Sequence, residues 1–216
     1  MINGFITLLN EKHPLSPIDC GEFAKMKVNG MDFSITAYKA EGLGHISVMQ
    51  AKGFFGLMKM DTLIINPTEL DLPLYSYDRI FAMGNDTLIV ELYDTMLSDY
   101  SDEEMMAVKA EEKYSAISER DPGEHWYDSI KLPSSISKKG KKKHLSLIDS
   151  LTAQHFDAYL KSSKASVTDK EAKQNKARVY VNGLIEKGGP STDVFKKSLG
   201  EEKTRKLFEE VLFGTK

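Results

Sequence analysis

The carboxylate of Asp78 has the setting in this sequence that most directly suggests chemistry. It ends the stretch Tyr75-Ser76-Tyr77-Asp78, and apolar residues follow from Ile80. Side chains alternate between the two faces of a strand, so Tyr75 and Tyr77 share one face and Ser76 and Asp78 the other. Because an unpaired buried carboxylate is costly, Asp78 must be solvated on an open face, paired, or lining a pocket. Only a pocket would make it a reactive group.

Local catalytic signatures are absent from the sequence. It has no glycine-rich phosphate loop, no dinucleotide fingerprint, no zinc-binding His-Glu-x-x-His helix and no nucleophile elbow. The five histidines lack metal-like spacing, and we expect each to be a surface or packing residue. A single cysteine, Cys20, excludes an intramolecular disulfide and protein-held iron–sulfur or thiolate zinc sites. Any enzyme activity must therefore use scattered side chains, and we expect no bound metal.

The composition is that of an ordinary globular protein. The 216 residues are 41% hydrophobic and 28% charged, with a net charge of −3. No apolar run approaches the roughly 18 residues that span a membrane, and no basic leader opens the chain. We expect one domain over residues 1–216, a cytoplasmic location, and neither nucleic acid nor membrane as a partner.

The pattern of elements changes near residue 97. Residues 4–12 have helical spacing, and residues 22–93 show period-two runs separated by short turns such as Asn29-Gly30, which predicts about six antiparallel strands. Residues 98–216 are predicted to be mainly helical with one edge strand. The expected helices cover 101–119, 145–164, 168–187, 191–199 and 200–213; the expected edge strand covers 125–133 and an exposed basic loop 137–144. A sheet followed by helices indicates the α+β class, with helices layered on the sheet.

Four segments resemble the ferredoxin-dependent bilin reductases. Residues 71–78 (Asp-Leu-Pro-Leu-Tyr-Ser-Tyr-Asp) are similar to the family signature Asp-Leu-Pro-(Ile/Leu)-Phe-Gly-x-Asp. Residues 199–214 look like its C-terminal helix, Phe-Gly-Glu to Val-Leu-Phe-Asp. Residues 90–92 (Val-Glu-Leu) and 129–133 (Ser-Ile-Lys-Leu-Pro) resemble two of its strands. The order and spacing of these matches agree with the family from residue 60 to residue 214.

The resemblance implies a three-layer α/β/α sandwich with a mainly antiparallel sheet and C-terminal helices. It implies an oxidoreductase that binds a linear tetrapyrrole such as biliverdin between the sheet and those helices, without a bound flavin or metal. Reduced ferredoxin, or flavodoxin, would supply single electrons in a radical mechanism, and protein side chains would supply protons. Asp78 falls on the family's central proton-donating aspartate. Desolvation in an apolar pocket raises a carboxyl pKa, which suits a proton donor.

The resemblance also assigns further site residues. Asp61 occupies the position of a catalytic histidine found in some members, and we expect it to be a second proton donor. Lys131 matches an arginine that pairs with a bilin propionate, and Glu91 and Tyr77 are expected to contact the substrate. The family's second aspartate motif is replaced by residues 188–191 (Gly-Gly-Pro-Ser).

Several alternatives stay open on the sequence alone. Asp78 and Lys131 can instead be ordinary solvated residues. The lysine run 138–143 is either a solvated loop or part of a docking surface for an acidic ferredoxin. The protein itself can be a non-catalytic tetrapyrrole carrier of the same fold, or an unrelated α+β interaction protein. Whether Asp78 faces a cavity separates the last alternative from the others.

Overall fold

A computed structural model describes residues 1–162 and 165–216 of the chain. Within these residues, one sheet of nine strands forms the centre of the molecule, and all its strand pairings are antiparallel. The strands are β1 (Leu15–Ile18), β2 (Lys25–Val28), β3 (Met31–Ala40), β4 (Gly44–Gly53), β5 (Met58–Pro67), β6 (Leu74–Ala82), β7 (Asn85–Tyr93), β8 (Ser118–Glu119) and β9 (Ile136–Lys141). The helices are α1 (Ile2–Lys12), α2 (Glu103–Ala110), α3 (Leu145–Lys161), α4 (Lys170–Lys187), α5 (Pro190–Leu199) and α6 (Glu201–Lys206), which continues as a π-helix over Leu207–Leu212. The predicted α+β class is confirmed.

The sheet is a meander in its central part. Its order is β1-β3-β4-β5-β6-β7-β9-β8, and β2 pairs with β3 beside β1. The turn between β2 and β3 is Asn29-Gly30, with φ angles of 48° and 76°. Both residues are therefore left-handed, as a tight hairpin turn requires, and this predicted turn is confirmed.

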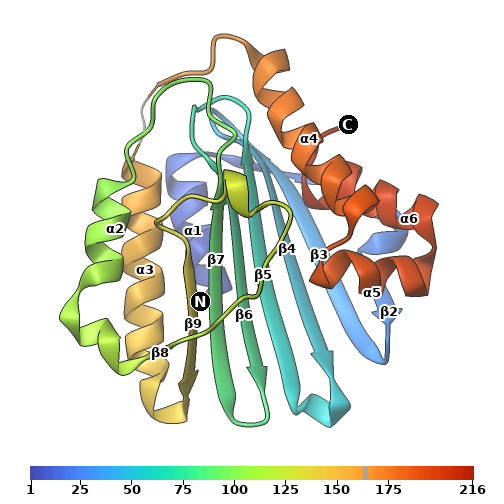
Figure 1. Ribbon diagram of the computed structural model, residues 1–216. Helices are drawn as coiled ribbons and strands as arrows, with labels where there is room; N and C mark the ends of the chain where they lie inside the picture. Colours follow the sequence, from blue (N-terminus) through green and yellow to red (C-terminus); the bar gives the residue numbers. More distant parts are fainter. Residues whose placement is uncertain (163–164) are drawn as a thin grey trace.

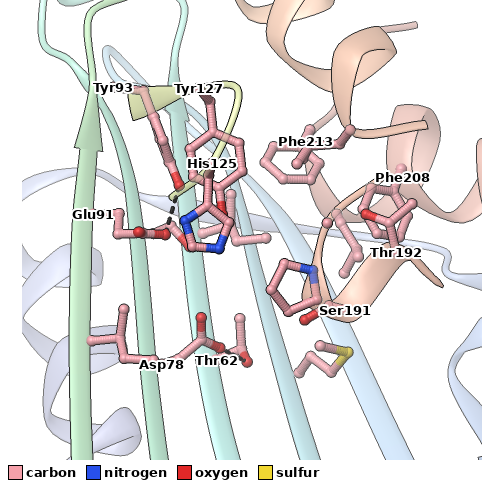
Figure 2. A pocket seen from close by; sticks show the side chains of 18 of the residues that line it. Thr62, Asp78, Glu91, Tyr93, His125, Tyr127, Ser191, Thr192, Phe208 and Phe213 are labelled. Atoms are coloured by element: carbon pink, nitrogen blue, oxygen red, sulfur yellow. Dashed lines mark hydrogen bonds between the residues drawn. The ribbon is translucent and has the colours of Figure 1, made fainter. Parts of the chain in front are cut away.

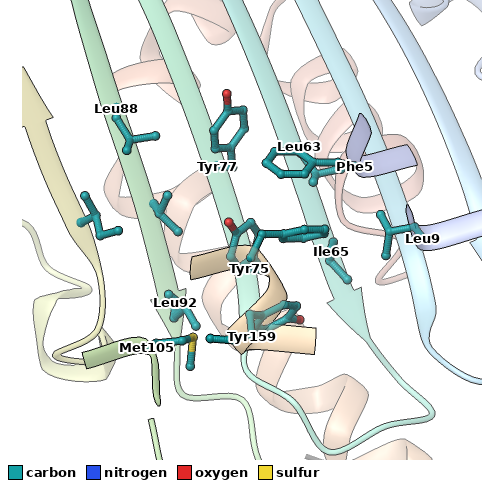
Figure 3. Close-up of a cluster of buried hydrophobic side chains, with 14 of the residues drawn as sticks. Phe5, Leu9, Leu63, Ile65, Tyr75, Tyr77, Leu88, Leu92, Met105 and Tyr159 are labelled. Carbon is teal, nitrogen blue, oxygen red and sulfur yellow. The ribbon is translucent and has the colours of Figure 1, made fainter. Parts of the chain in front are cut away.

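Helices cover both faces of the sheet, which gives three layers (Figure 1). The hydrophobic cluster on one face includes side chains from α1, α2 and α3, and the cluster on the other includes side chains from α4, α5 and the π-helix. Figure 3 shows the first cluster, where Tyr75 and Tyr77 of β6 lie against Leu63 of β5 and Phe5 of α1. The Phe5 and Tyr77 rings meet edge to face at 5.2 Å. The sandwich architecture implied by the resemblance is confirmed.

The predicted basic loop at 137–144 is wrong, because it contains strand β9. Ile136, Lys138 and Gly140 point inward, and Lys138 is buried. Its ammonium donates to Glu119 at 2.5 Å and to two backbone carbonyls at 3.3 and 3.4 Å. A lysine can occupy an inward position of a strand when its long aliphatic chain packs inside and its charge is paired. For this reason the run of lysines was mistaken for an exposed loop although it contains a strand.

Other predicted boundaries also need correction. Residues 125–133 form no strand: they hold a 3₁₀ turn at Asp128–Ile130 and a single bridge from Lys131 to Tyr93. The helix predicted over 101–119 ends at Ala110 and is followed by a 3₁₀ turn and β8. The helix predicted over 168–187 begins at Lys170, and Asp169 caps it by accepting from the Ala172 amide at 2.9 Å. The predicted helix end at residue 164 lies outside the described residues.

A buried ion pair fixes α4 to the sheet. Lys173 of α4 donates to Asp71 at 3.2 Å and to the Leu72 carbonyl at 2.5 Å, and both charged side chains are buried. Asp71 also accepts from the Leu97 amide and from the Ser98 hydroxyl, the latter at 2.7 Å. Because the loop that begins at Asp71 leads directly into β6, this cluster sets the distance between the sheet and the C-terminal helices.

Candidate functional site

A pocket of about 220 Å³ lies between the sheet and the C-terminal helices (Figure 2). Its walls are side chains of β4 to β7 on one side, of α4, α5 and the π-helix on the other, and of the loop around residues 120–127. Most of the lining is apolar, with a few polar groups facing inward, as in small-molecule sites. The polar and charged side chains in the lining are Thr62, Ser76, Asp78, Glu91, Tyr93, Arg120, His125, Tyr127, Tyr180, Ser191 and Thr192.

Asp78 lies on the sheet side of this pocket, on the same face as Ser76 and opposite to the face of Tyr75 and Tyr77, as the strand alternation predicted for these four residues. Thr62 is its direct cross-strand neighbour and donates from Oγ1 to Asp78 Oδ1 at 2.5 Å. The Oδ2 atom has no hydrogen-bond partner among the described residues. Burial raises the pKa of Asp78 to about 6, although the Thr62 hydrogen bond acts in the opposite direction. A carboxyl with this pKa can both hold and release a proton near neutral pH.

Glu91 supplies a second carboxylate to the pocket lining, and its contact with a substrate stays a prediction. It lies on β7 opposite Ser76 and accepts a hydrogen bond of 2.6 Å from the Tyr93 hydroxyl. Its negative charge is one of the causes that raise the pKa of Asp78. The two carboxyl groups therefore influence each other on one face of the sheet.

The loop wall contains a histidine that the sequence analysis treated as a surface or packing residue. The His125 ring stacks on the Tyr127 ring, with centroids 4.9 Å apart and planes 9° apart, and both line the pocket. Its Nδ1 atom is buried and has no hydrogen-bond partner. The sequence His125-Trp126-Tyr127 is unusually aromatic for a connecting segment. This was the feature of the sequence that could have marked the segment as part of a ligand pocket.

The first turn of α5 forms the opposite wall. Pro190, Ser191 and Thr192 line the pocket and follow Gly189, where the chain enters the helix. Here the family motif has its second aspartate, and this chain presents hydroxyl groups instead. Asp193 is not among the lining residues. The apolar rings of Phe208 and Phe213 complete this side, as Figure 2 shows.

The structure does not bring Asp61 or Tyr77 into the pocket. On β5 and β6, Thr62 pairs with Asp78 and Asp61 pairs with Arg79, so Asp61 points to the opposite face. There it accepts a hydrogen bond of 2.8 Å from Gln50. Tyr77 is fully buried in the cluster of Figure 3. Both expectations fail for one reason: residues an odd number of positions from Asp78 face the other way in these paired strands.

The expected propionate ligand Lys131 lies beside the pocket but not in its lining. Its ammonium is paired with Asp128 at 2.5 Å and approaches Glu91 at 3.9 Å, so neighbouring carboxylates already balance its charge. Arg120 is the cationic side chain among the pocket-lining residues. Its guanidinium donates to the Ser137 hydroxyl at 3.3 Å.

No protein-family model matches the chain, and no curated protein matches it. Among solved structures, it is similar to phytochromobilin synthase from tomato in complex with biliverdin, with a TM-score of 0.75. This chain has the fold of phytochromobilin synthase. The superposition covers 100% of this chain and 83% of the tomato chain, at 16% sequence identity. The suspected resemblance to the ferredoxin-dependent bilin reductases is therefore confirmed at the level of the fold.

The described residues contain neither a metal-binding cluster nor a membrane-spanning helix. No group of three or more His, Cys, Asp or Glu side chains is arranged to hold a metal ion in residues 1–162 and 165–216. Across the same two ranges, no helix combines the length and apolar character needed to cross a bilayer.

Proposed function

We propose that this protein binds a linear tetrapyrrole in the pocket and reduces it. The observation that carries the proposal is Asp78: a carboxyl with a raised pKa, held by Thr62, on the floor of a largely apolar pocket. The shared fold with a protein solved in complex with biliverdin supports this ligand class. A conjugated, flat and mainly apolar molecule matches a pocket walled by a sheet on one side and aromatic side chains on the other.

In the proposed reaction, Asp78 protonates the tetrapyrrole. Reducing one double bond takes two electrons and two protons. In this proposal, an external one-electron donor such as reduced ferredoxin or flavodoxin delivers the electrons one at a time. Each added electron makes the conjugated system more basic, so a carboxyl with a pKa of about 6 can transfer its proton to it. Solvent then reprotonates Asp78 through the open side of the pocket.

The remaining polar groups position the ligand. Arg120 is suited to pair with a propionate, because a guanidinium can donate two hydrogen bonds to one carboxylate. The amide groups in the first turn of α5, next to Ser191 and Thr192, favour negative charge at the opposite wall of the pocket. His125 also lines the pocket, and its imidazole would hydrogen-bond the pyrrole edge or a ring carbonyl.

A second candidate is a tetrapyrrole carrier without reductase activity. The observation in its favour is the first turn of α5, where Ser191 and Thr192 take the place expected for a second proton-donating carboxylate. With Glu91 engaged by Tyr93, Asp78 is then the main group available for protonation. Binding alone is compatible with both candidates, and turnover separates them.

The test is an anaerobic absorption titration of the purified protein with biliverdin, followed by reduced ferredoxin and, separately, reduced flavodoxin. A saturable spectral shift that changes again only after the reductant is added supports a reductase. A saturable shift with no further change in either case identifies a carrier. No saturable shift removes both candidates.

A further inference from the structure

Four large apolar side chains are exposed at one end of the sheet. Phe54, Phe55 and Leu57 at the tip of the β4–β5 hairpin are 61%, 108% and 68% exposed, and Met83 at the tip of the β6–β7 hairpin is 93% exposed. Because Met58 of β5 pairs with Ala82 of β6, the two tips are neighbours. Figure 1 shows both hairpins turning at the lower end of the molecule, beyond the C-terminal helices.

Three of these residues also have an unfavourable backbone conformation. Phe54, Phe55 and Met83 have φ angles of 50°, 55° and 51°. Residues other than Gly, Asn and Asp are strained in this left-handed region of backbone conformation. Folding alone would favour Asn or Gly at such turns, and would not favour large exposed apolar groups. Both features together indicate that the side chains serve a contact outside the fold.

Lysines surround the apolar tips. Lys52 and Lys59 flank the β4–β5 tip and lie directly opposite each other, an arrangement in which like charges repel. Lys141 is the last residue of β9 and pairs with Asn85 next to the β6–β7 tip, and Lys142 and Lys143 follow it. None of these five exposed lysines forms an ion pair within the described residues. On the adjacent β2–β3 hairpin, the exposed carboxylate of Asp32 lies 3.9 Å from Lys27.

We propose that this hairpin end, comprising the four apolar tip residues and the five lysines, docks on an anionic lipid bilayer. Protruding apolar side chains insert below the headgroups, and the ring of lysines pairs with the lipid phosphates and carboxylates. Charge complementarity identifies the anionic surface. The four side chains protrude from two neighbouring hairpin turns and do not form one continuous face, which favours a deformable bilayer over a protein, because a stable protein interface needs an extended and complementary surface.

The sequence has no continuous apolar run long enough to span a bilayer, and for this reason no membrane partner was expected. The proposed contact instead combines residues 54–57 with residue 83, which only the β5–β6 pairing brings together. The same end of the sheet continues into the pocket face, since Met60 and Ile80 line the pocket just inside the two tips. Docking there would bring an apolar ligand dissolved in the lipid close to the part of the pocket that Met60 and Ile80 line.

The test is co-sedimentation of the full chain with vesicles of phosphatidylcholine alone and with 30% phosphatidylserine. We expect binding to the anionic vesicles that weakens with added salt, and little binding to the neutral ones. Phe55→Asn with Met83→Asn should lower partitioning at least about tenfold. Because Asn tolerates the left-handed conformation, the thermal midpoint of this variant should stay equal or rise. Each Lys→Gln change at 141–143 should lower partitioning about fivefold.

A matched control removes an exposed apolar side chain elsewhere. Val179 on α4 is 63% exposed, and Val179→Gln should leave vesicle binding unchanged. Failure to bind anionic vesicles overturns the proposal. So does binding that the double Asn variant retains, because this would leave only diffuse electrostatic attraction. A concentration-dependent dimer in sedimentation velocity that the double variant abolishes, without vesicle binding, would assign the tips to self-association instead.

Discussion

Thr62 and Asp78 face each other across β5 and β6, and the threonine hydroxyl donates to the aspartate at 2.5 Å. The pair lies on the pocket side of the sheet. Thr62 engages Oδ1, and Oδ2 has no hydrogen-bond partner among the described residues. Burial raises the pKa of Asp78 and the hydrogen bond lowers it, so the net value of about 6 results from two opposing effects. The chemistry proposed for this protein depends on that balance.

Thr62→Val should move the pH dependence of reduction to higher pH. Asp78 is active as a proton donor only when protonated, so kcat/KM should fall as pH rises through about 6. The Thr62 hydrogen bond favours the charged carboxylate, and its loss raises the pKa further. We expect the falling limb of the plot of kcat/KM against pH to move to higher pH by about one unit. The control is Thr87→Val on β7, and a limb that stays in place or moves down would contradict the assignment.

Asp78→Asn should stabilise the protein at high pH. The folded pKa of about 6 lies above the ordinary value of 3.8, so protonation favours the folded state. This contribution is complete below about pH 4 and is lost as pH rises through 6. Asn resembles the neutral acid, so its unfolding free energy in urea should exceed that of the wild type by about 2 kcal/mol at pH 8. The difference should nearly vanish at pH 4. Equal stability at both pH values would mean that Asp78 is well solvated.

Arg120→Gln should weaken biliverdin binding by roughly tenfold or more, because a charge-assisted hydrogen bond is lost. Lys131→Met should change the dissociation constant far less, since Asp128 and Glu91 already balance Lys131. Biliverdin dimethyl ester provides the control: without free propionates, it should bind Arg120→Gln and the wild type alike. If Lys131→Met has the larger effect on biliverdin, the propionate assignment belongs to Lys131, as the sequence comparison suggested.

Lys173→Met should destabilise the fold by about 3 kcal/mol, because it leaves the buried Asp71 carboxylate without its cation. Equilibrium urea unfolding measures this directly. Lys161→Met is the matched control, since its ion pair with Asp157 is exposed to solvent and should contribute little to stability. Similar effects of the two substitutions would show that the Asp71–Lys173 pair does not hold α4 on the sheet.

The sequence was sufficient for the features that depend on local pattern. The Asn29-Gly30 turn predicted the β2–β3 hairpin, and the alternation at residues 75–78 predicted the face of Asp78. Asp61 was assigned by its spacing from Asp78 in related sequences. Strand register is a long-range property, however, and it pairs Thr62, not Asp61, with the aspartate.

The other site residues could not be predicted because they reach the pocket through tertiary packing. His125 lies in a loop with no regular period, and only the placement of that loop over the sheet brings its ring to Asp78's side of the molecule. Lys138 belongs to a run of lysines that is typical of a solvent-exposed loop. It is nevertheless buried, and its ammonium donates hydrogen bonds to Glu119 and to two backbone carbonyls. The predicted cytoplasmic location and ferredoxin partner stay predictions.

The central claim is that Asp78 protonates a bound tetrapyrrole, and one comparison tests it most directly. Biliverdin bound to Asp78→Asn and to Asp61→Asn would be mixed anaerobically with reduced ferredoxin and followed by visible absorption. Both variants should bind biliverdin as the wild type does. We predict that Asp78→Asn slows formation of the reduced product by a factor of about 10² or more, whereas Asp61→Asn, altered on the opposite face, reacts within about threefold of the wild-type rate. Wild-type turnover in Asp78→Asn, or equal loss in both variants, would contradict the account.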